Sequence, residues 1–159
     1  MITSRRTFLL GGGAVVVAAC AGGSPAEAQS NFPFRLTDAQ WRQRLSTAAY
    51  NVLRRHSTER PGSSPLDREG RRGTFHCAGC NHPLFSSTTK FDSRTGWPSF
   101  YRPLSRAVGT REDGSMMMSR TEVHCANCGG HLGHVFNDGP RPTGLRYCMN
   151  GVAMTFRAA

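Results

Sequence analysis

The chain has 159 residues, of which 38% are hydrophobic, and a formal net charge of +10. Its N-terminal apolar run, residues 8–19, is shorter than the about 20 residues that a helix needs to cross a bilayer, which argues against a membrane span. The arginines are scattered, with no run longer than two. We therefore interpret the charge as a solvated basic surface rather than a nucleic-acid or anionic-membrane interface.

The first 28 residues have the features of a bacterial export leader. Arg5 and Arg6 precede the apolar run in the twin-arginine form. The sequence Val-Ala-Ala-Cys ending at Cys20 resembles a lipobox, in which this cysteine is acylated, whereas Ala-Glu-Ala ending at Ala28 resembles an ordinary cleavage site. The lipobox is favoured because an isolated cysteine there is otherwise unexplained, and a chance cysteine is the alternative. We expect a periplasmic protein, with Cys20 as the candidate lipid anchor.

Residues 36–159 are expected to form a single domain after a linker at residues 29–35. Removing the leader takes away Arg5, Arg6 and Glu27, which leaves 131 residues with a net charge of +9. That length suits one hydrophobic core, which buries roughly two-thirds of the surface of the unfolded chain.

One or two short helices are predicted at the start of this domain. Thr37 and Gln40 match the capping box, in which a Thr N-cap is followed three residues later by Gln. Apolar residues recur at helical spacing from Trp41 to Val52, and the Ser46-Thr47 pair is a candidate start for the second helix. The apolar face of these helices would cover the hydrophobic core.

The remainder of the domain has the pattern of a mostly antiparallel β structure. From Gly73 onward, short apolar or β-branched runs are separated by Gly, Asn, Asp and Pro. The strands are expected within residues 74–77, 84–86, 107–109, 121–125, 134–136, 145–150 and 152–156. The predicted fold class is therefore mainly β with short N-terminal helices.

Four of the six cysteines form two C-x-x-C pairs, Cys77 with Cys80 and Cys125 with Cys128. Four thiolates suit a tetrahedral structural zinc, and the 44 residues between the pairs mean that the metal would join two distant hairpins. Two disulfides are the alternative, which an exported protein permits. Zinc is favoured because zinc knuckles use this turn and because the twin-arginine route exports folded proteins.

Cys148 is the candidate nucleophile, because it alone has no evident partner. Arg146 and Asn150 are two residues away on either side, and such residues share one face of an extended strand. A guanidinium beside the sulfur would favour the thiolate. The alternative is a small buried hydrophobic cysteine, but a neighbouring charge is rarely buried without a partner.

His131 and His134 follow the second C-x-x-C pair closely. If they lie on a turn entering a strand, both imidazoles could reach Cys148, where they would deliver a proton and position water. A lone histidine is more often an ordinary core or surface residue. A second metal at this pair is disfavoured because no carboxylate or third ligand is evident beside it.

Pro98 stiffens the segment from Gly96 to Phe100, which also carries Trp97. Aromatic rings on a stiff loop can wall a pocket for a small apolar group. Ordinary core aromatics are the alternative, and spacing alone does not separate the two interpretations.

Several motifs, all in one order, closely resemble the methionine-R-sulfoxide reductase B family. They are Thr58-Glu59-Arg60-Pro61, the two H-C-A-x-C motifs at residues 76–80 and 124–128, and residues 90–101, 120–123, 131–136 and 144–150. The resemblance extends from about Leu36 to Phe156. It implies two antiparallel sheets with short N-terminal helices, one structural zinc, and reduction of the R epimer of methionine sulfoxide in proteins.

The resemblance also implies roles for individual residues. Cys148 would attack the substrate and be left as sulfenic acid, with its thiolate stabilised by Arg146. Trp97 would pack against the ε-methyl group and Phe136 would line the site, while His131, His134 and Asn150 would orient the sulfoxide oxygen or its water. Many relatives carry a resolving cysteine where this chain has Thr95. We therefore expect that an external thiol, such as a thioredoxin-like protein, regenerates the enzyme. The protein is expected to be a monomer.

Two other classes of function are compatible with parts of the sequence. A zinc-ribbon module could hold nucleic acid, which the export leader disfavours; salt-dependent binding that survives Cys148→Ala would support it. A cysteine hydrolase could use Cys148 with His131 or His134, and would process esters or amides while ignoring sulfoxides.

Overall fold

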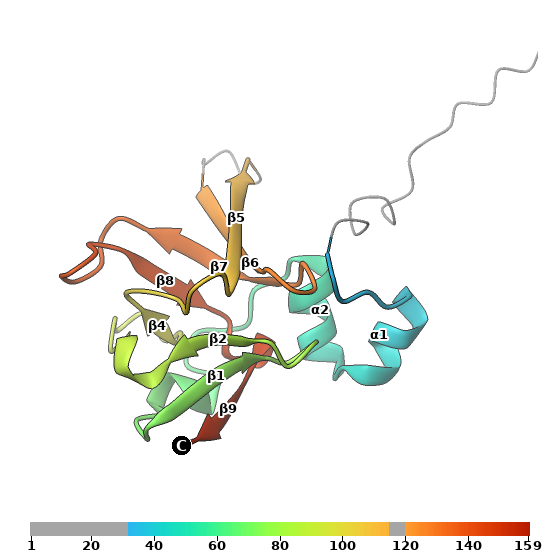
Figure 1. Cartoon of the computed structure of the whole chain (residues 1–159), viewed down its shortest axis with the longest axis horizontal. Helices are drawn as coiled ribbons and strands as arrows, with labels where there is room; N and C mark the ends of the chain where they lie inside the picture. The colour runs from blue at the N-terminus through green and yellow to red at the C-terminus, as the bar shows by residue number, and fades with distance from the viewer. Residues whose placement is uncertain (1–31, 115–119) are drawn as a thin grey trace, which may run out of the picture.

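A computed structural model describes residues 32–114 and 120–159. The expected leader, with Cys20 and its two processing sites, lies outside the described residues. The helical elements are α1 (Asp38–Arg44), α2 (Thr47–Arg55), η2 (Pro65–Arg68), η3 (Ser87–Thr89) and η5 (Gly151–Ala153). The strands are β1 (Gly73–Cys77), β2 (Pro83–Ser86), β3 (Lys90–Phe91), β4 (Ser99–Phe100), β5 (Val108–Asp113), β6 (Arg120–Cys125), β7 (His131–Phe136), β8 (Arg146–Met149) and β9 (Met154–Ala158) (Figure 1). Within the described ranges, no helix combines the length and apolar character needed to span a bilayer.

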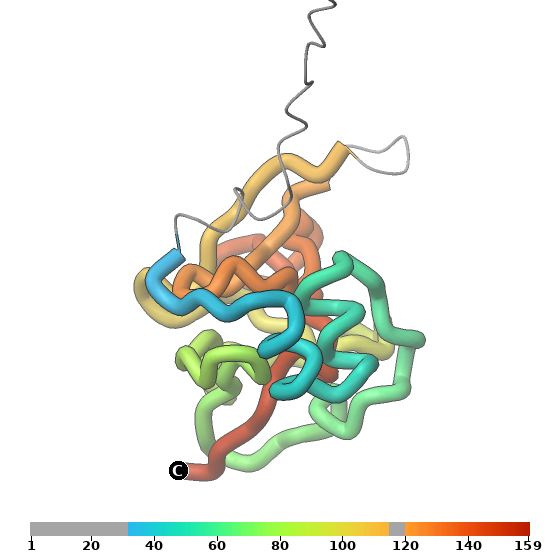
Figure 2. The backbone as a smooth tube through the Cα atoms, turned by 90° about the vertical axis from the view of Figure 1, so that its right-hand side faces the viewer, coloured from blue at the N-terminus to red at the C-terminus, as the bar shows by residue number. Residues whose placement is uncertain are grey.

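The two predicted helices are confirmed, together with the residues that start them. The Thr37 side chain accepts a hydrogen bond from the Gln40 N–H, and the Gln40 side chain in turn accepts from the Thr37 N–H at 2.8 Å. Ser46 caps α2, which buries Leu53 and neighbouring apolar residues. Helix α2 packs against β7 and η5, so the helical segment lies beside the junction of the two sheets (Figure 2).

All strand pairs are antiparallel and form two sheets, as expected for a mainly β fold. One sheet has the strand order β2-β1-β9 and the other β3-β4-β8-β7-β6-β5. Several details differ from the sequence expectation, which did not include the two-residue strands β3 and β4. Residues 131–133, expected in a turn, belong to β7, and residues 152–153, expected in a strand, belong to η5.

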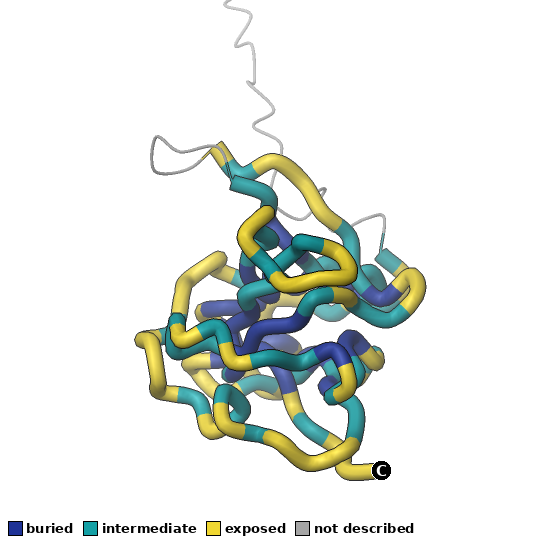
Figure 3. The backbone as a smooth tube through the Cα atoms, turned by 90° about the vertical axis from the view of Figure 1, so that its left-hand side faces the viewer, coloured by how far each residue is buried: buried dark blue, intermediate teal, exposed yellow. Residues whose placement is uncertain are grey.

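The hydrophobic core lies between the two sheets. Phe75 and Phe85 of the smaller sheet meet Phe100 of the larger one, with ring centroids 4.9 Å and 4.3 Å from that of Phe100. Phe100 is fully buried, so it is a core aromatic and not part of a pocket wall. Figure 3 shows the buried stretches gathered in the middle of the molecule, with exposed loops around them.

Strand β8 is held between β4 and β7 in the larger sheet. Gly133 on β7 lies so close to β8 that an added Cβ would be 2.1 Å from the carbonyl oxygen of Cys148. Only glycine allows this approach, which explains the Gly within the His-Leu-Gly-His motif. The central position of β8 places Cys148 between side chains of two neighbouring strands.

Candidate active site and metal centre

The four cysteines of the C-x-x-C pairs converge on one point. Their sulfur atoms all lie within 4.8 Å of one another, with 3.7 Å between Cys77 and Cys128 and 3.6 Å between Cys80 and Cys125. Four sulfurs about 2.3 Å from a tetrahedral zinc are about 3.8 Å apart, so the set fits this ion. All four are free cysteines, and their separations far exceed the about 2.05 Å of a disulfide.

The cluster joins the two sheets. Cys77 and Cys80 belong to the β1–β2 turn of the smaller sheet, whereas Cys125 and Cys128 belong to the β6–β7 turn of the larger one. Hydrogen bonds from Cys125 and other sulfurs, together with burial, raise the pKa of Cys77 and of Cys128. A bound cation would lower these pKa values, because it would balance the negative charge of several thiolates. Cys80 is half-buried, while the other three sulfur-bearing residues are buried.

Cys148 faces polar side chains from both neighbouring strands. It pairs with Ser99 across β4 and with His134 across β7, and such directly opposed residues have Cβ atoms about 5 Å apart. The hydroxyl of Thr95 lies 3.9 Å from the Cys148 sulfur. Thr95 and Ser99 both hydrogen-bond the hydroxyl of Ser93, at 2.8 and 2.7 Å, which fixes the hydroxyl groups around the thiol.

The ionisation of Cys148 reflects opposing influences. Burial raises the pKa of this thiol above its ordinary value, while Thr95, Arg146 and Ser99 lower it by less. Arg146 thus acts in the direction expected from the sequence, but burial outweighs it. The Arg146 guanidinium also donates to both carboxylate oxygens of Asp138, at 2.9 and 2.8 Å. That carboxylate offsets part of the positive charge near the sulfur.

Each predicted histidine has a carboxylate partner. His134 Nε2 lies 2.7 Å from Asp113 Oδ2, and Asp113 also pairs with Arg120 at 3.2 Å. His131 Nδ1 lies 2.7 Å from Glu122 Oε1, and the two imidazole centroids are 5.4 Å apart. The expectation that no carboxylate joins these histidines is therefore wrong. Both acids come from β5 and β6, and only the sheet register brings them here.

His56, Glu122 and His131 are close enough to hold a metal ion. However, Arg111 hydrogen-bonds both carboxylate oxygens of Glu122. Although burial raises the pKa of Glu122, hydrogen bonds from His131, His56 and Arg111 hold it well below its usual range. The carboxylate already has a cationic partner, so we interpret this group as a buried ion-pair network behind His131.

A cavity of about 130 Å³ opens at Cys148. Five predicted site residues line it, namely Cys148, Trp97, His134, Phe136 and Asn150. Three further residues that line it, Thr58, Arg120 and Gly133, stand in motifs noted above but had no role assigned. Two predicted residues stand behind the cavity wall: His131 is 2% exposed, and Arg146 stacks on Phe136 at 4.4 Å from its ring centroid.

The backbone of Glu59 holds two of the lining side chains in place. Its N–H donates to Asn150 Oδ1 at 2.9 Å, and its carbonyl accepts from Trp97 Nε1 at 3.1 Å. Asn150 Nδ2 donates to the Leu132 carbonyl at 3.0 Å. A side-chain amide has two N–H donors, so one remains for a ligand in the cavity.

Comparisons with known proteins identify the family. A SelR domain model matches residues 45–158. The chain is 53% identical over 121 residues to the peptide methionine sulfoxide reductase MsrB of Agrobacterium fabrum, covering 76% of this chain and 90% of that protein. The MsrB of Leptospira interrogans is 47% identical over 128 residues, covering 80% and 98%. That of Pseudomonas syringae pv. syringae is 56% identical over 116 residues, covering 72% and 88%. The chain belongs to the MsrB family.

The family resemblance predicted from the motifs is therefore confirmed. The match to the SelR domain spans every residue that lines the cavity, from Thr58 to Asn150, and all four cysteines of the metal cluster. The candidate active site and the candidate metal centre of this MsrB-family chain thus both lie within the family domain.

Proposed function

We propose that this MsrB-family enzyme reduces the R epimer of methionine sulfoxide in oxidised proteins to methionine, which repairs them. Family membership supports an oxidoreductase that acts on methionine sulfoxide. The observation that carries the chemistry is a single half-buried thiol, Cys148, in a small cavity that also presents an imidazole and two aromatic rings.

The reaction follows from what this thiol can do. The Cys148 thiolate attacks the sulfoxide sulfur while the sulfoxide oxygen gains a proton from a water positioned by His134, because that sulfur is otherwise a weak electrophile. The oxygen passes to the cysteine as sulfenic acid, and methionine leaves with two more electrons than the sulfoxide had. His134 stands opposite Cys148 on β7, within reach of this oxygen.

The histidines have distinct tasks in this proposal. Burial lowers the pKa of His134, although Asp113 opposes this, so the imidazole is neutral at neutral pH and can position water. Hydrogen bonding to Asp113 fixes the ring orientation. His131 is buried against Glu122 and acts as a positioning residue behind His134.

Epimer selection follows from the two kinds of wall in the cavity. Trp97 and Phe136 offer apolar rings for the ε-methyl group, while His134 and Asn150 offer polar groups for the oxygen. The opposite epimer would exchange these substituents and place oxygen against the aromatic rings. An unpaired polar group in such a site is costly, which supports discrimination.

Regeneration requires an external thiol in this proposal. Thr95 lies next to Cys148 where many relatives have a resolving cysteine. The other cysteines of the described part of the chain are in the metal cluster. Two thiols, or one dithiol such as a thioredoxin-like protein, would reduce the sulfenic acid, releasing water and forming a disulfide.

Zinc and export complete the proposal. The Cys77, Cys80, Cys125 and Cys128 cluster would hold one structural zinc, which supplies no step of the reaction. The twin-arginine form of the first 28 residues supports export to the periplasm, with Cys20 as the candidate lipid anchor. The enzyme is proposed to act as a monomer.

The test offers the R and S epimers of a blocked methionine sulfoxide separately, with dithiothreitol as reductant. We expect consumption of the R epimer alone. The family resemblance implies this epimer, and the two kinds of wall would admit only one arrangement of the methyl group and the oxygen. After excess substrate without reductant, mass analysis should show Cys148 as sulfenic acid without an intramolecular disulfide. Equal use of the two epimers would refute the stereochemical assignment.

The pKa of Cys148 gives a pH-dependent prediction. Because burial raises this pKa, the thiolate fraction and the rate of alkylation of Cys148 should still be rising above the ordinary thiol value of 9.0. Arg146→Gln removes a cation that lowers the pKa, so the midpoint should move to higher pH, whereas Arg146→Lys should stay near the wild type. Mass analysis of the Cys148 peptide after timed iodoacetamide treatment measures this. A midpoint below 9.0, or a downward shift in Arg146→Gln, would contradict it.

A further inference from the structure

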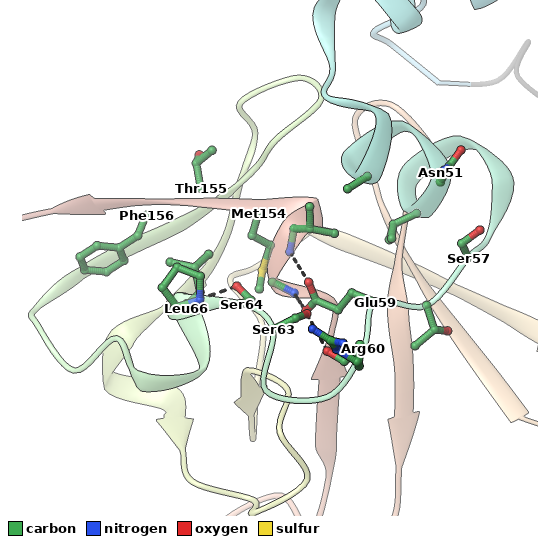
Figure 4. A pocket seen from close by; sticks show the side chains of 16 residues that line it. Asn51, Ser57, Glu59, Arg60, Ser63, Ser64, Leu66, Met154, Thr155 and Phe156 are labelled. Atoms are coloured by element: carbon green, nitrogen blue, oxygen red, sulfur yellow. Dashed lines mark hydrogen bonds between the residues drawn. The ribbon is translucent and has the colours of Figure 1, made fainter.

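A groove of about 850 Å³ lies between β9, η2 and the segment that follows α2 (Figure 4). Val152, Met154 and Phe156 line it from one side, and Leu66 and Pro65 of η2 line it too. Thr58 lines both this groove and the cavity at Cys148, so the two open on the same exposed residue. The proposed reaction does not use this groove.

The groove follows the open edge of β9. Side chains alternate across a strand, so a hollow on one face would touch every second residue. Here three consecutive residues, Met154, Thr155 and Phe156, line the groove, and none from β1 does. Strand β1 is the only strand that pairs with β9 in the described part of the chain, so the groove lies on the opposite edge.

The register shows which backbone groups face that edge. The Ala153 carbonyl accepts from Ala78 and the Ala159 N–H donates to Arg72, so odd-numbered residues of this segment direct their backbone groups toward β1. The backbone N–H and C=O groups of the even-numbered residue Phe156 therefore point to the open edge. No other strand pairs there within residues 32–114 and 120–159. An edge strand of this kind is a template for an added strand.

The acid in the groove does not require a basic ligand. The Glu59 carboxylate accepts hydrogen bonds from the backbone N–H groups of Gly151 and Val152 (Figure 4). The protein itself thus supplies hydrogen-bond donors to both oxygens of this carboxylate. Arg60 and several hydroxyl-bearing residues also line the groove, but apolar atoms make up most of the lining surface, so the groove suits apolar side chains.

We propose that this groove binds the polypeptide segment next to the oxidised methionine of a protein substrate, as an extended strand along β9 with apolar side chains in the groove. The inference rests on the proposed function, because it places the methionine sulfoxide at Cys148 and leads the adjoining chain past Thr58. Cys148 and Thr155 are seven residues apart in the enzyme's own chain. Seven residues span at most about 25 Å, so the groove at Thr155 lies no further than that from Cys148. A substrate segment within about seven residues of the sulfoxide can therefore reach the groove.

The test compares three substrates with dithiothreitol as reductant: a blocked R-methionine sulfoxide, a peptide that flanks it with Val, Ile and Leu, and a peptide that flanks it with Ser and Gln. We expect kcat/KM for the apolar peptide to exceed that for the polar peptide by about tenfold. Methylating backbone nitrogens of the apolar flank should remove much of this advantage, because strand addition needs main-chain hydrogen bonds.

Groove variants test the assignment of the surface. Thr155→Glu places a charge at an exposed groove position, and Leu66→Glu does so at a partly buried one. Both should bring kcat/KM for the apolar peptide down to that of the polar peptide and leave the blocked amino acid unchanged. Leu45→Glu is the matched control, since Leu45 is also partly buried against the core but lies outside the groove. It should preserve the tenfold preference.

The outcomes separate this inference from the proposed function. If the blocked sulfoxide is not reduced, the proposed function fails and the inference with it. If the blocked sulfoxide is reduced but the two peptides have equal kcat/KM, the groove assignment alone is overturned. Groove variants that slow turnover with thioredoxin, but change no substrate preference with dithiothreitol, would instead assign the groove to the reductant and would also overturn it.

Discussion

Replacing Cys148 with serine is expected to lower the turnover of methionine sulfoxide by about 10⁴-fold or more. A serine hydroxyl does not ionise near neutral pH and cannot take the oxygen as a stable sulfenic acid. No other cysteine of the described chain lines the cavity. Single-turnover reduction of the blocked R epimer, followed by chromatography of the methionine formed, measures the loss.

Two controls make this result specific. Cys148→Ser should retain the zinc content and unfolding temperature of the wild type, because the cluster does not involve this residue. Thr95→Ser keeps a hydroxyl near the sulfur and should retain most of the activity. Activity of Cys148→Ser within tenfold of the wild type would refute the assignment of the nucleophile.

Replacing Cys125 with serine is expected to unfold the domain. A structural zinc in a cysteine site contributes on the order of 10–16 kcal/mol to folding, which is comparable to the whole stability of about 5–15 kcal/mol that domains have. Cys125 is fully buried and its cluster joins the two sheets. Circular dichroism on heating and metal analysis of the purified variant measure the effect.

The wild type provides the complementary measurement. It should contain about one zinc per chain, and a strong chelator should lower its melting temperature sharply. Cys148→Ser serves as the control, since it removes a cysteine outside the cluster. A wild type that contains no metal and melts at the same temperature with and without chelator would contradict the structural role.

The features with local signatures could be predicted from the sequence. The capping box at Thr37, the paired C-x-x-C turns and the lone Cys148 each depend on residues a few positions apart, and the helices and the cysteine cluster lie where these signals put them. Strand β4, only two residues long, was not predicted because so short a segment has no periodicity of its own. It exists because Ser99 pairs with Cys148.

The parts of the site that depend on register could not be predicted. Asp113 and Glu122 reach the two histidines only because β5, β6 and β7 align in one particular way. Burial of Cys148, which sets the direction of its pKa shift, likewise depends on residues distant in the sequence, such as Thr58 and Trp97, that line the same cavity. The groove along β9 depends on which strand ends the smaller sheet, and that order is not written in any single motif.

The half-buried position of Cys80 has a consequence for how long the enzyme survives. Its three companion sulfurs are shielded, so Cys80 is the point at which peroxide or hypochlorite would first reach the cluster. Loss of one sulfur ligand would weaken the binding of a zinc ion held there and loosen this link between the sheets. An oxidant is thus expected to inactivate the enzyme at a residue that lies outside the cavity where its chemistry takes place.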